Sequence, residues 1–180
     1  MFKTLIKKLA IELEKNGLPY MLIGGQAVLL YGEPRLTKDI DITLGVDSSK
    51  FDIVSKVVET CNLKALVDNP KDFVNDVMVF PVIEESSGIR VDFIFSFSPY
   101  EREAIDRAKK INFEEVLVNF ASLEDVIIHK TIAGRPRDID DIKSIILKNP
   151  NFDRKYIKQW LKQFDLSLGE KFEERFEYLL

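Results

Sequence analysis

The sequence predicts an α+β protein, in which a small mixed β-sheet is flanked by helices and followed by a C-terminal helical extension. Two observations predict this class. Short apolar runs typical of strands alternate with helical patterns through the first two thirds of the chain. From residue 121 onward, every patterned segment is helical. We therefore expect a core over residues 1–120 and a helical region over residues 121–180 that packs on it.

The expected core begins with a helix over Phe2–Lys15, whose apolar residues recur at helical spacing before Gly17 and Pro19 end it. Alternating short elements follow it along the chain. We expect a strand over Tyr20–Ile23, a helix over Gln26–Tyr31, a strand over Asp39–Leu44, and a helix that runs from the cap Asp47-Ser48-Ser49 to about Thr60.

The second half of the chain adds a hairpin and then helices. Two strand-like runs, Val77–Ile83 and Ile89–Phe95, are joined by EESSG, which is typical of a hairpin connection. A helix over Tyr100–Ala108 and a weak strand around Val116–Phe120 complete the core. The helices expected in the C-terminal region are Leu123–Ala133, Pro136–Leu147, Asp153–Phe164 and Gly169–Tyr178.

Size and composition limit the class of protein. A chain of 180 residues suits one domain, with or without a helical extension. With 46% hydrophobic residues the chain has enough apolar material for a packed core. Its net charge of −4 argues against a surface that coats nucleic acids in general, although a local basic groove is compatible with it. The single cysteine, Cys61, excludes an intramolecular disulfide framework and a cysteine-based zinc cluster, and we expect it in the core.

No membrane-directing segment is expected. No apolar run approaches the length that spans a bilayer. The N-terminal segment MFKTLIKKLAIELEKNG has the pattern of an amphipathic helix and not of a signal peptide. We therefore expect a cytoplasmic protein without a membrane partner.

The expected strand Asp39–Leu44 carries two aspartates one residue apart. Because successive strand side chains point to opposite faces, Asp39 and Asp41 are expected side by side, with Ile40 and Ile42 toward the core. Two carboxylates this close repel each other and raise one pKa unless a cation lies between them. Mg²⁺ suits such oxygen ligands and is often shared with substrate phosphates. The structural alternatives are that the two aspartates keep an edge strand soluble or cap a helix.

A glycine pair, Gly24-Gly25, precedes the helix expected over Gln26–Tyr31. The free N–H groups and the dipole at a helix N-terminus favour a phosphate, although a Gly-Gly pair also occurs simply as a tight turn. A phosphate cradle beside a metal site points to nucleotide chemistry.

A third aspartate, Asp92, lies among β-branched and aromatic residues in the run IRVDFIF, which is typical of a buried strand. An ionised carboxylate there is costly unless it is paired or binds a metal. On a strand next to Asp39 and Asp41, it could act as a metal ligand and as the general base for an attacking hydroxyl. Pairing with an Arg or Lys is the alternative.

These motifs together resemble the DNA polymerase β-type nucleotidyltransferase superfamily. The resemblance rests on GG-x-A at Gly24–Ala27, R-x-T-x-D-I-D at Arg35–Asp41, the strand residue Asp92, and H-K-x-x-A-G-R-x-x-D-x-x-D at His129–Asp141. It covers roughly residues 17–147 and is closest to the small bacterial and archaeal branch that contains abortive-infection toxin and antibiotic nucleotidyltransferases. The resemblance implies the nucleotidyltransferase fold, with the helical region as its extension.

The resemblance also implies roles for individual residues. Gly24 and Gly25 would lie against the nucleotide phosphates, while Asp39, Asp41 and Asp92 would form a catalytic triad that holds two Mg²⁺ ions. One position departs from the pattern, because many members have Gly-Ser at the turn and place the serine hydroxyl on a phosphate. The Gly-Gly form also occurs in the toxin-like branch, so the backbone cradle is still expected here.

Four cations are candidates for binding the nucleotide. The resemblance implies that Lys130 contacts the triphosphate and that Arg135 assists it, and Arg35 and Lys38 belong to the motif that precedes the aspartates. Each has a structural alternative. Lys130 and Arg135 could form a solvated helical face or an ion-pair network reaching to residue 141, and Arg35 and Lys38 could only neutralise the aspartates. For His129, the sole histidine, a structural or solvent role is the more common one.

The function implied is Mg²⁺-dependent transfer of a nucleoside monophosphate from an NTP, with ATP the expected donor, to a hydroxyl acceptor, with release of pyrophosphate. The acceptor could be RNA, a protein or a small molecule, and a protein partner such as an antitoxin is possible. The alternative is a catalytically inactive module that binds a nucleotide or a protein partner. It is motivated by the missing turn serine and by the acidic C-terminal tail.

Overall fold

The computed structural model describes residues 2–96 and 98–180. Its described strands form one mixed sheet of seven strands in the order β3-β4-β5-β2-β1-β7-β6. Their bounds are β1 (Tyr20–Leu22), β2 (Asp39–Leu44), β3 (Lys64–Ala65), β4 (Val79–Glu84), β5 (Ile89–Phe95), β6 (Lys109–Phe113) and β7 (Val116–Phe120). The fold class expected from the sequence is therefore confirmed.

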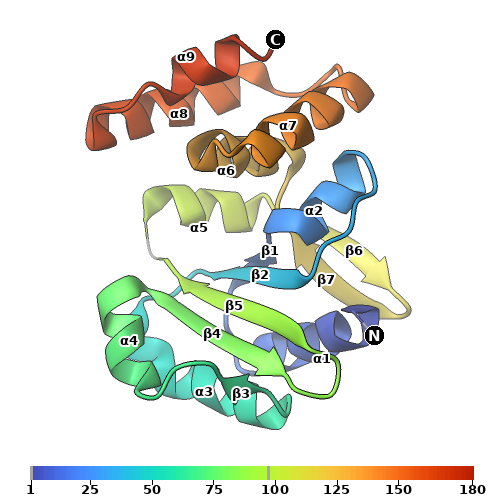
Figure 1. Cartoon of the computed structure of the whole chain (residues 1–180), viewed down its shortest axis with the longest axis vertical. Coiled ribbons are helices and arrows are strands. Elements are labelled where there is room, and N and C mark those ends of the chain that lie inside the picture. Colours follow the sequence, from blue (N-terminus) through green and yellow to red (C-terminus); the bar gives the residue numbers. More distant parts are fainter. Residues whose placement is uncertain (1, 97) are drawn as a thin grey trace.

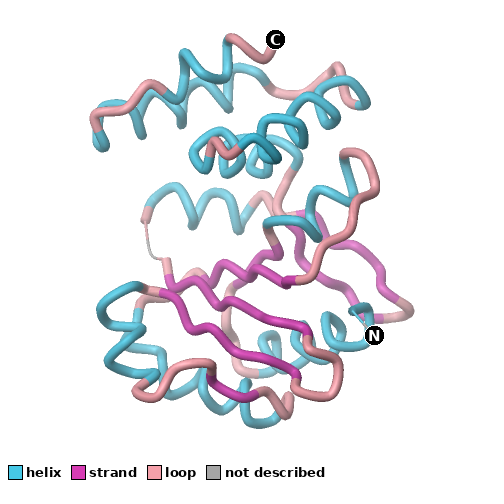
Figure 2. The backbone as a smooth tube through the Cα atoms, in the orientation of Figure 1, coloured by secondary structure: helices cyan, strands magenta, loops and turns pink. Residues whose placement is uncertain are grey.

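The helices form layers on both sides of this sheet (Figure 1). They are α1 (Phe2–Lys15), α2 (Gly24–Tyr31), α3 (Phe51–Thr60), α4 (Pro70–Val77), α5 (Pro99–Asp106), α6 (Leu123–Ala133), α7 (Pro136–Lys148), α8 (Arg154–Leu168) and α9 (Phe172–Glu177), with a short 3₁₀ turn η1 (Ser48–Lys50) before α3. Helices α1 and α3 lie below the sheet in Figure 1, whereas α2 and α5 lie between the sheet and the helices α6–α9. Figure 2 shows the same separation of strands and C-terminal helices.

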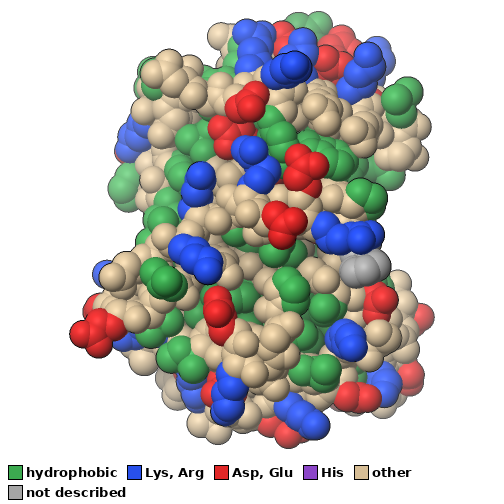
Figure 3. Space-filling view, turned by 180° about the vertical axis from the view of Figure 1, so that it is seen from behind, with side chains coloured by type: hydrophobic (Ala, Val, Ile, Leu, Met, Phe, Trp, Pro, Cys, Tyr) green, Lys and Arg blue, Asp and Glu red, His purple; other side chains and the backbone are tan. Residues whose placement is uncertain are grey.

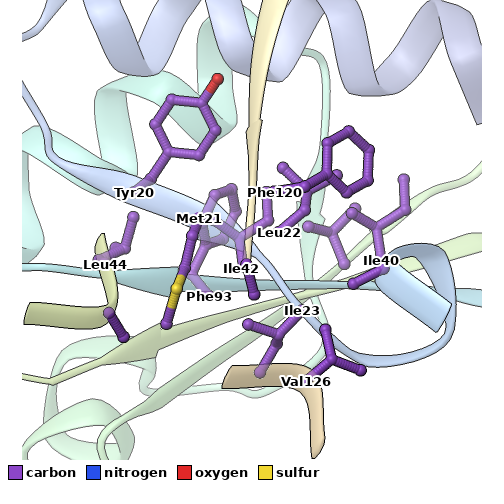
Figure 4. Packing of buried hydrophobic residues seen from close by; sticks show 14 of the residues in the cluster. Tyr20, Met21, Leu22, Ile23, Ile40, Ile42, Leu44, Phe93, Phe120 and Val126 are labelled. Atoms are coloured by element: carbon purple, nitrogen blue, oxygen red, sulfur yellow. The ribbon is translucent and has the colours of Figure 1, made fainter. Parts of the chain in front are cut away.

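The strands that carry the aspartates lie at the centre of the sheet. Strand β2 pairs in parallel with β5 and antiparallel with β1. Along β2 the burial alternates, because Ile40 and Ile42 are fully buried while Asp39 and Asp41 are not. In the core, Ile40, Ile42 and Phe93 pack among residues of β1 and β7 (Figure 4). Burial of these apolar side chains is what holds β2 and β5 in register.

Many expected elements have the observed bounds. The helices Phe2–Lys15 and Leu123–Ala133 and the strands Asp39–Leu44, Ile89–Phe95 and Val116–Phe120 are as expected. The cap before α3 is confirmed too, since the Asp47 carboxylate accepts a hydrogen bond from the Ser49 N–H at 2.9 Å.

Three elements were missed, and one strand was started too early. Helix α4 begins at Pro70, a first-turn proline typical of helix starts. Helix α4 includes Val77, which was expected to be the first residue of a strand. Met78, in the left-handed conformation (φ 58°), separates α4 from β4. The other missed elements, β3 and β6, are a two-residue strand and a largely exposed edge strand. Strand β3 is too short to show an apolar alternation, and β6 shows it only at Ile111 and Phe113.

No helix in the described part of the chain is both long enough and apolar enough to cross a bilayer. On the face opposite to that of Figure 1, Lys and Arg side chains are interspersed with Asp and Glu (Figure 3). This distribution agrees with the small net charge of −4.

Candidate active site

The N-terminus of α2 opens directly beside the aspartates. The helix begins at Gly24, and its N-cap residue, Ile23, provides no side-chain cap. The first N–H groups of a helix have no partner within the helix, so they can bind an anion. The turn is joined to β2 by the backbone, because the Ile23 N–H donates to the Asp41 carbonyl at 2.9 Å.

Both glycines of this turn are required by their surroundings. Gly24 has a φ of +62°, and a methyl group on its Cα would overlap the Asp41 carboxylate. A Cβ on Gly25 would lie 2.5 Å from the Thr37 Oγ1, which is too close for any side chain. A serine, which many members of the superfamily carry at this turn, would require Thr37 to move.

The three aspartates share one face of the sheet. In the parallel pair of β2 and β5, Asp41 is directly opposite Asp92, and Asp39 is opposite Arg90. Alternation along β2 places Asp39 on the same face as Asp41. Asp39 is exposed, whereas Asp41 and Asp92 are partly buried. The expectation that a neighbouring strand brings Asp92 to the other two is met by this register.

Burial is the main reason that the pKa of Asp41 is raised, and the charges of Asp92 and Asp39 raise it further. Lys130 and Arg135 act in the opposite direction but do not cancel these effects. An ionised Asp41 thus carries a cost that a bound cation would relieve.

Asp92 already has a cationic partner. Its carboxylate accepts a hydrogen bond from the Arg90 Nε at 2.9 Å. This hydrogen bond is the main reason that the pKa of Arg90 is raised. Among the described residues, no group of three or more His, Cys, Asp or Glu side chains is arranged to hold a metal ion. The donor set still fits Mg²⁺, which is usually held by one or two carboxylates together with substrate phosphates and water.

A buried ion-pair network lies across the cavity from the sheet, on α6 and α7. The Lys130 ammonium is 2.6 Å from Asp138 and 3.0 Å from Asp141, and all three residues are buried. Arg35 reaches the same network through two hydrogen bonds to Asp141, of 2.9 and 3.0 Å. The loop before β2 is thereby attached to the C-terminal helices.

Arg135 joins this network from its exposed side. Its Nε donates to Asp138 at 2.6 Å, although the Arg135 side chain itself is 73% exposed. Burial alone would raise the pKa of Asp138, but the hydrogen bonds from Arg135 and Lys130 outweigh burial and lower it. The ion-pair network, which the sequence left as an alternative to phosphate binding, is thus present.

One cavity of about 680 Å³ connects these features, a size typical of small-molecule sites. All nine site residues expected from the sequence line it, namely Gly24, Gly25, Arg35, Lys38, Asp39, Asp41, Asp92, Lys130 and Arg135. Five further lining residues were not singled out: Leu36, Thr37, Arg90, Arg137 and Asp138.

The missed residues left different signals in the sequence. Arg90 is two residues before Asp92 and so shares its face of the strand. Thr37 and Asp138 stand inside the motifs Arg35–Asp41 and His129–Asp141, where the resemblance implies no role for them. Arg137 is an exposed residue in the first turn of α7, and no periodicity marks it. Within residues 2–96 and 98–180, Lys38 and Arg137 are the lining cations without an ion pair.

His129 is close to the site but contributes to packing. Its Nε2 is buried and has no hydrogen-bond partner among the described residues, and its ring lies 5.7 Å from that of Tyr100. Burial is the main cause that lowers its pKa to about 4, so the imidazole is neutral at pH 7. The structural role expected for this histidine agrees with its surroundings.

Comparison with known proteins now identifies the class. Residues 2–177 match the model of a family described as nucleotidyltransferase of unknown function (DUF6036). The chain belongs to this family. It is thus a nucleotidyltransferase, in agreement with the superfamily resemblance. A search of curated proteins finds no match to the sequence.

Solved structures agree with the nucleotidyltransferase fold. The antibiotic-resistance factor ANT(2'')-Ia is 18% identical over 93% of this chain and 92% of its own, with a TM-score of 0.62. An antigenic nucleotidyltransferase-like protein from Paracoccidioides brasiliensis is 19% identical over 80% of this chain and 74% of its own, with a TM-score of 0.57. The lincosamide antibiotic adenylyltransferase LnuA is 18% identical over 74% and 89%, with a TM-score of 0.52. At these identities the likeness concerns the fold.

Proposed function

We propose that this nucleotidyltransferase moves a nucleoside monophosphate from an NTP to a hydroxyl acceptor and releases pyrophosphate, in a reaction that depends on Mg²⁺. One observation carries the proposal. A single cavity is lined by three carboxylates on one sheet face, by an uncapped helix N-terminus and by six cations. Carboxylates for a metal and donors for a triphosphate are the parts that such a transfer needs.

The triphosphate would lie between the α2 N-terminus and the cations of the opposite wall. The N–H groups of Gly24 and Gly25 would bind phosphate oxygens, and Lys38 and Arg137, which have no ion pair within the described chain, would add charge-assisted hydrogen bonds. Lys130 and Arg35 are held by buried carboxylates, so they contribute a positive wall of fixed shape. Preorganised charge of this kind stabilises the negative charge that develops on the leaving pyrophosphate.

The chemistry would take place over the sheet. Asp39, Asp41 and Asp92 would hold Mg²⁺, which when bound would polarise the phosphate and activate the acceptor oxygen. The acceptor oxygen would form a bond to the α-phosphorus while the bond from that phosphorus to the bridging oxygen of pyrophosphate breaks. Asp92 would take the proton of the acceptor hydroxyl, and Arg90 would orient its carboxylate.

ATP is the donor that we propose, and a small molecule, an RNA or a protein supplies the acceptor hydroxyl. Among the proteins of similar fold, LnuA is a lincosamide antibiotic adenylyltransferase, and one structure of ANT(2'')-Ia is a complex with adenylyl-2''-tobramycin. These two proteins support adenylyl transfer to a small hydroxyl-bearing molecule as the first acceptor class to test. A cytoplasmic location and a protein partner such as an antitoxin remain parts of the same proposal.

A catalytically inactive, nucleotide-binding module is the second candidate. The observation that favours it is the Arg90–Asp92 ion pair at 2.9 Å, which occupies the carboxylate that would take the proton. In this case the cavity would bind an NTP without turning it over.

One experiment separates the two functions. The protein is incubated with Mg²⁺ and each labelled NTP, together with cellular RNA, protein or metabolites, and both pyrophosphate and labelled product are measured. Label in one acceptor class and release of pyrophosphate support transfer. Calorimetric binding of ATP with neither product nor pyrophosphate supports the module, and absence of NTP binding contradicts both.

A further inference from the structure

We infer that the Thr37 hydroxyl is a phosphate-binding group of this site and replaces the side chain that residue 25 cannot carry. The inference rests on the proposed function, since it names a further contact to the triphosphate. Thr37 lies on the loop between α2 and β2 and lines the same cavity as the aspartates and the α2 N-terminus.

The Thr37 hydroxyl lies close to the first turn of α2. A Cβ built on Gly25 would lie 2.5 Å from the Thr37 Oγ1 and 2.9 Å from its Cβ. The Thr37 hydroxyl therefore fills the space into which a side chain at the second residue of α2 would project. It thus lies beside the first turn of α2, and the leading N–H groups of a helix have no partner within the helix. A phosphate bound by those N–H groups has oxygens within reach of this hydroxyl.

The present partner of the hydroxyl is a backbone carbonyl. Thr37 Oγ1 donates to the Asp39 carbonyl at 3.3 Å, which is long for an O–H···O hydrogen bond. A phosphate oxygen is a charged acceptor and forms a shorter and stronger bond than a carbonyl does. The hydroxyl hydrogen can thus turn from Asp39 to the ligand at little cost.

The loop that carries Thr37 is held in place by Arg35. The Arg35 Nη2 lies 3.5 Å from the same point above Gly25, and the Arg35 guanidinium is held by two hydrogen bonds to the buried Asp141. The loop that carries Thr37 is consequently attached on one side to α7 and on the other to β2. A contact group on such a loop loses little freedom when a ligand binds.

The first test compares Thr37→Val, which removes the hydroxyl at nearly constant shape, with Thr37→Ser, which keeps it. Binding of inorganic tripolyphosphate and of a non-hydrolysable NTP analogue is measured by calorimetry with Mg²⁺. We expect Thr37→Val to weaken both ligands roughly fivefold to thirtyfold, and Thr37→Ser to bind within about twofold of the wild type. Thermal unfolding of each variant verifies that the fold is intact.

The second test transfers the hydroxyl from residue 37 to residue 25. Gly25→Ser alone would clash with Thr37 and is expected to weaken tripolyphosphate, whereas Gly25→Ser/Thr37→Gly makes room for the serine. The double variant should bind more tightly than Thr37→Gly alone, because the hydroxyl returns from the helix side. A purely structural role for Thr37 would produce no such rescue.

The outcomes distinguish this inference from the proposed function. Wild-type affinity in Thr37→Val, with NTP turnover intact, overturns the role of Thr37 and leaves the function standing. A wild-type protein that binds neither tripolyphosphate nor any NTP overturns the proposed function and the inference with it.

Discussion

The carboxylates on the two walls of the cavity have opposite electrostatic surroundings. On the sheet, Asp41 is partly buried beside Asp92 and Asp39, and the pKa of Asp41 is raised. On α6 and α7, Asp138 and Asp141 are more deeply buried, yet each is matched by cations within 3.0 Å, and the pKa of Asp138 is lowered. The carboxylates of the helical wall are all paired, whereas on the sheet wall Arg90 pairs with Asp92 but Asp39 and Asp41 have no ion pair among the described residues. This difference indicates that the sheet wall would bind a cation and that the helical wall is a fixed scaffold.

The largest expected effect concerns turnover at the sheet wall. Changing Asp39 and Asp41 together to Asn should lower NTP turnover roughly a thousandfold or more, because the metal ligands are lost. Steady-state release of pyrophosphate is the measurement. Asp140→Asn, an exposed aspartate of α7 outside the cavity, is the matched control and should keep wild-type turnover. Turnover that survives in the double variant would contradict the metal role of this wall.

The next effect concerns stability at the helical wall. Asp138→Asn should lower the free energy of unfolding by about 3 kcal/mol, because it leaves the buried Lys130 with only Asp141. Urea unfolding at pH 7 measures this loss. Lys130→Met added to Asp138→Asn should recover part of it, since the uncompensated charge is then removed. If the single variant is as stable as the wild type, the network is not a scaffold.

His129 tests how strongly the helical layer excludes an added charge. Its pKa is about 4 in the folded protein, mainly through burial, with Lys130 lowering it and Glu101 opposing the shift. In the unfolded chain the imidazole titrates near pH 6.5. Between these values only the unfolded state takes the proton, so stability is fully present above pH 6.5 and is lost as the pH falls toward 4. The loss is about 3 kcal/mol at most.

The measurement is urea unfolding between pH 7 and pH 4 for the wild type and for His129→Gln, which does not titrate. The wild type should lose more stability over this range than the variant. Parallel curves for the two proteins would show that the histidine is not excluded from solvent.

The smallest effect has the opposite sign to that of Asp138→Asn. Without metal at pH 7, Asp41→Asn should raise the free energy of unfolding by about 1 kcal/mol, because it removes a buried charge beside two like charges. Since the folded pKa of Asp41 is raised, the cost of its charge appears as the pH rises through that pKa. The gain should therefore vanish in acid. A loss of stability in Asp41→Asn would show that the two walls do not differ as described.

The parts of the fold that were predictable from the sequence are those in which burial sets the pattern. The strand Asp39–Leu44 and the helix Phe2–Lys15 have one apolar face each, so their periodicity reveals both type and bounds. Strand β6 is a mostly exposed edge strand in which two residues, Ile111 and Phe113, pack against the core, so its apolar pattern is short. Helix α4 differs from β6, because it has a start signal at Pro70 but buries only Val74, so it lacks a broad apolar face.

The site was predictable as a set of residues but not as a set of contacts. Carboxylate spacing and the superfamily motifs were enough to bring nine residues to one cavity. That Arg35 pairs with Asp141, 106 positions away, depends on how α7 packs against the loop before β2. Likewise, no local pattern shows that Thr37 would fill the space above Gly25.

The hydrogen bond from the Ile23 N–H to the Asp41 carbonyl has a mechanical consequence. At 2.9 Å it extends the pairing of β1 with β2 into the turn that faces the phosphates, so this turn is joined to the strand that carries the metal ligands. The phosphate turn and the strand that carries the carboxylates therefore form one rigid unit. Helix α7 is attached to this unit through the Arg35–Asp141 hydrogen bonds, and the Lys148 ammonium and the Asn149 amide also donate to the carbonyls of Gly32 and Tyr31, at 3.0 and 2.8 Å. The distance from the phosphates to the metal would therefore stay constant whichever NTP is bound.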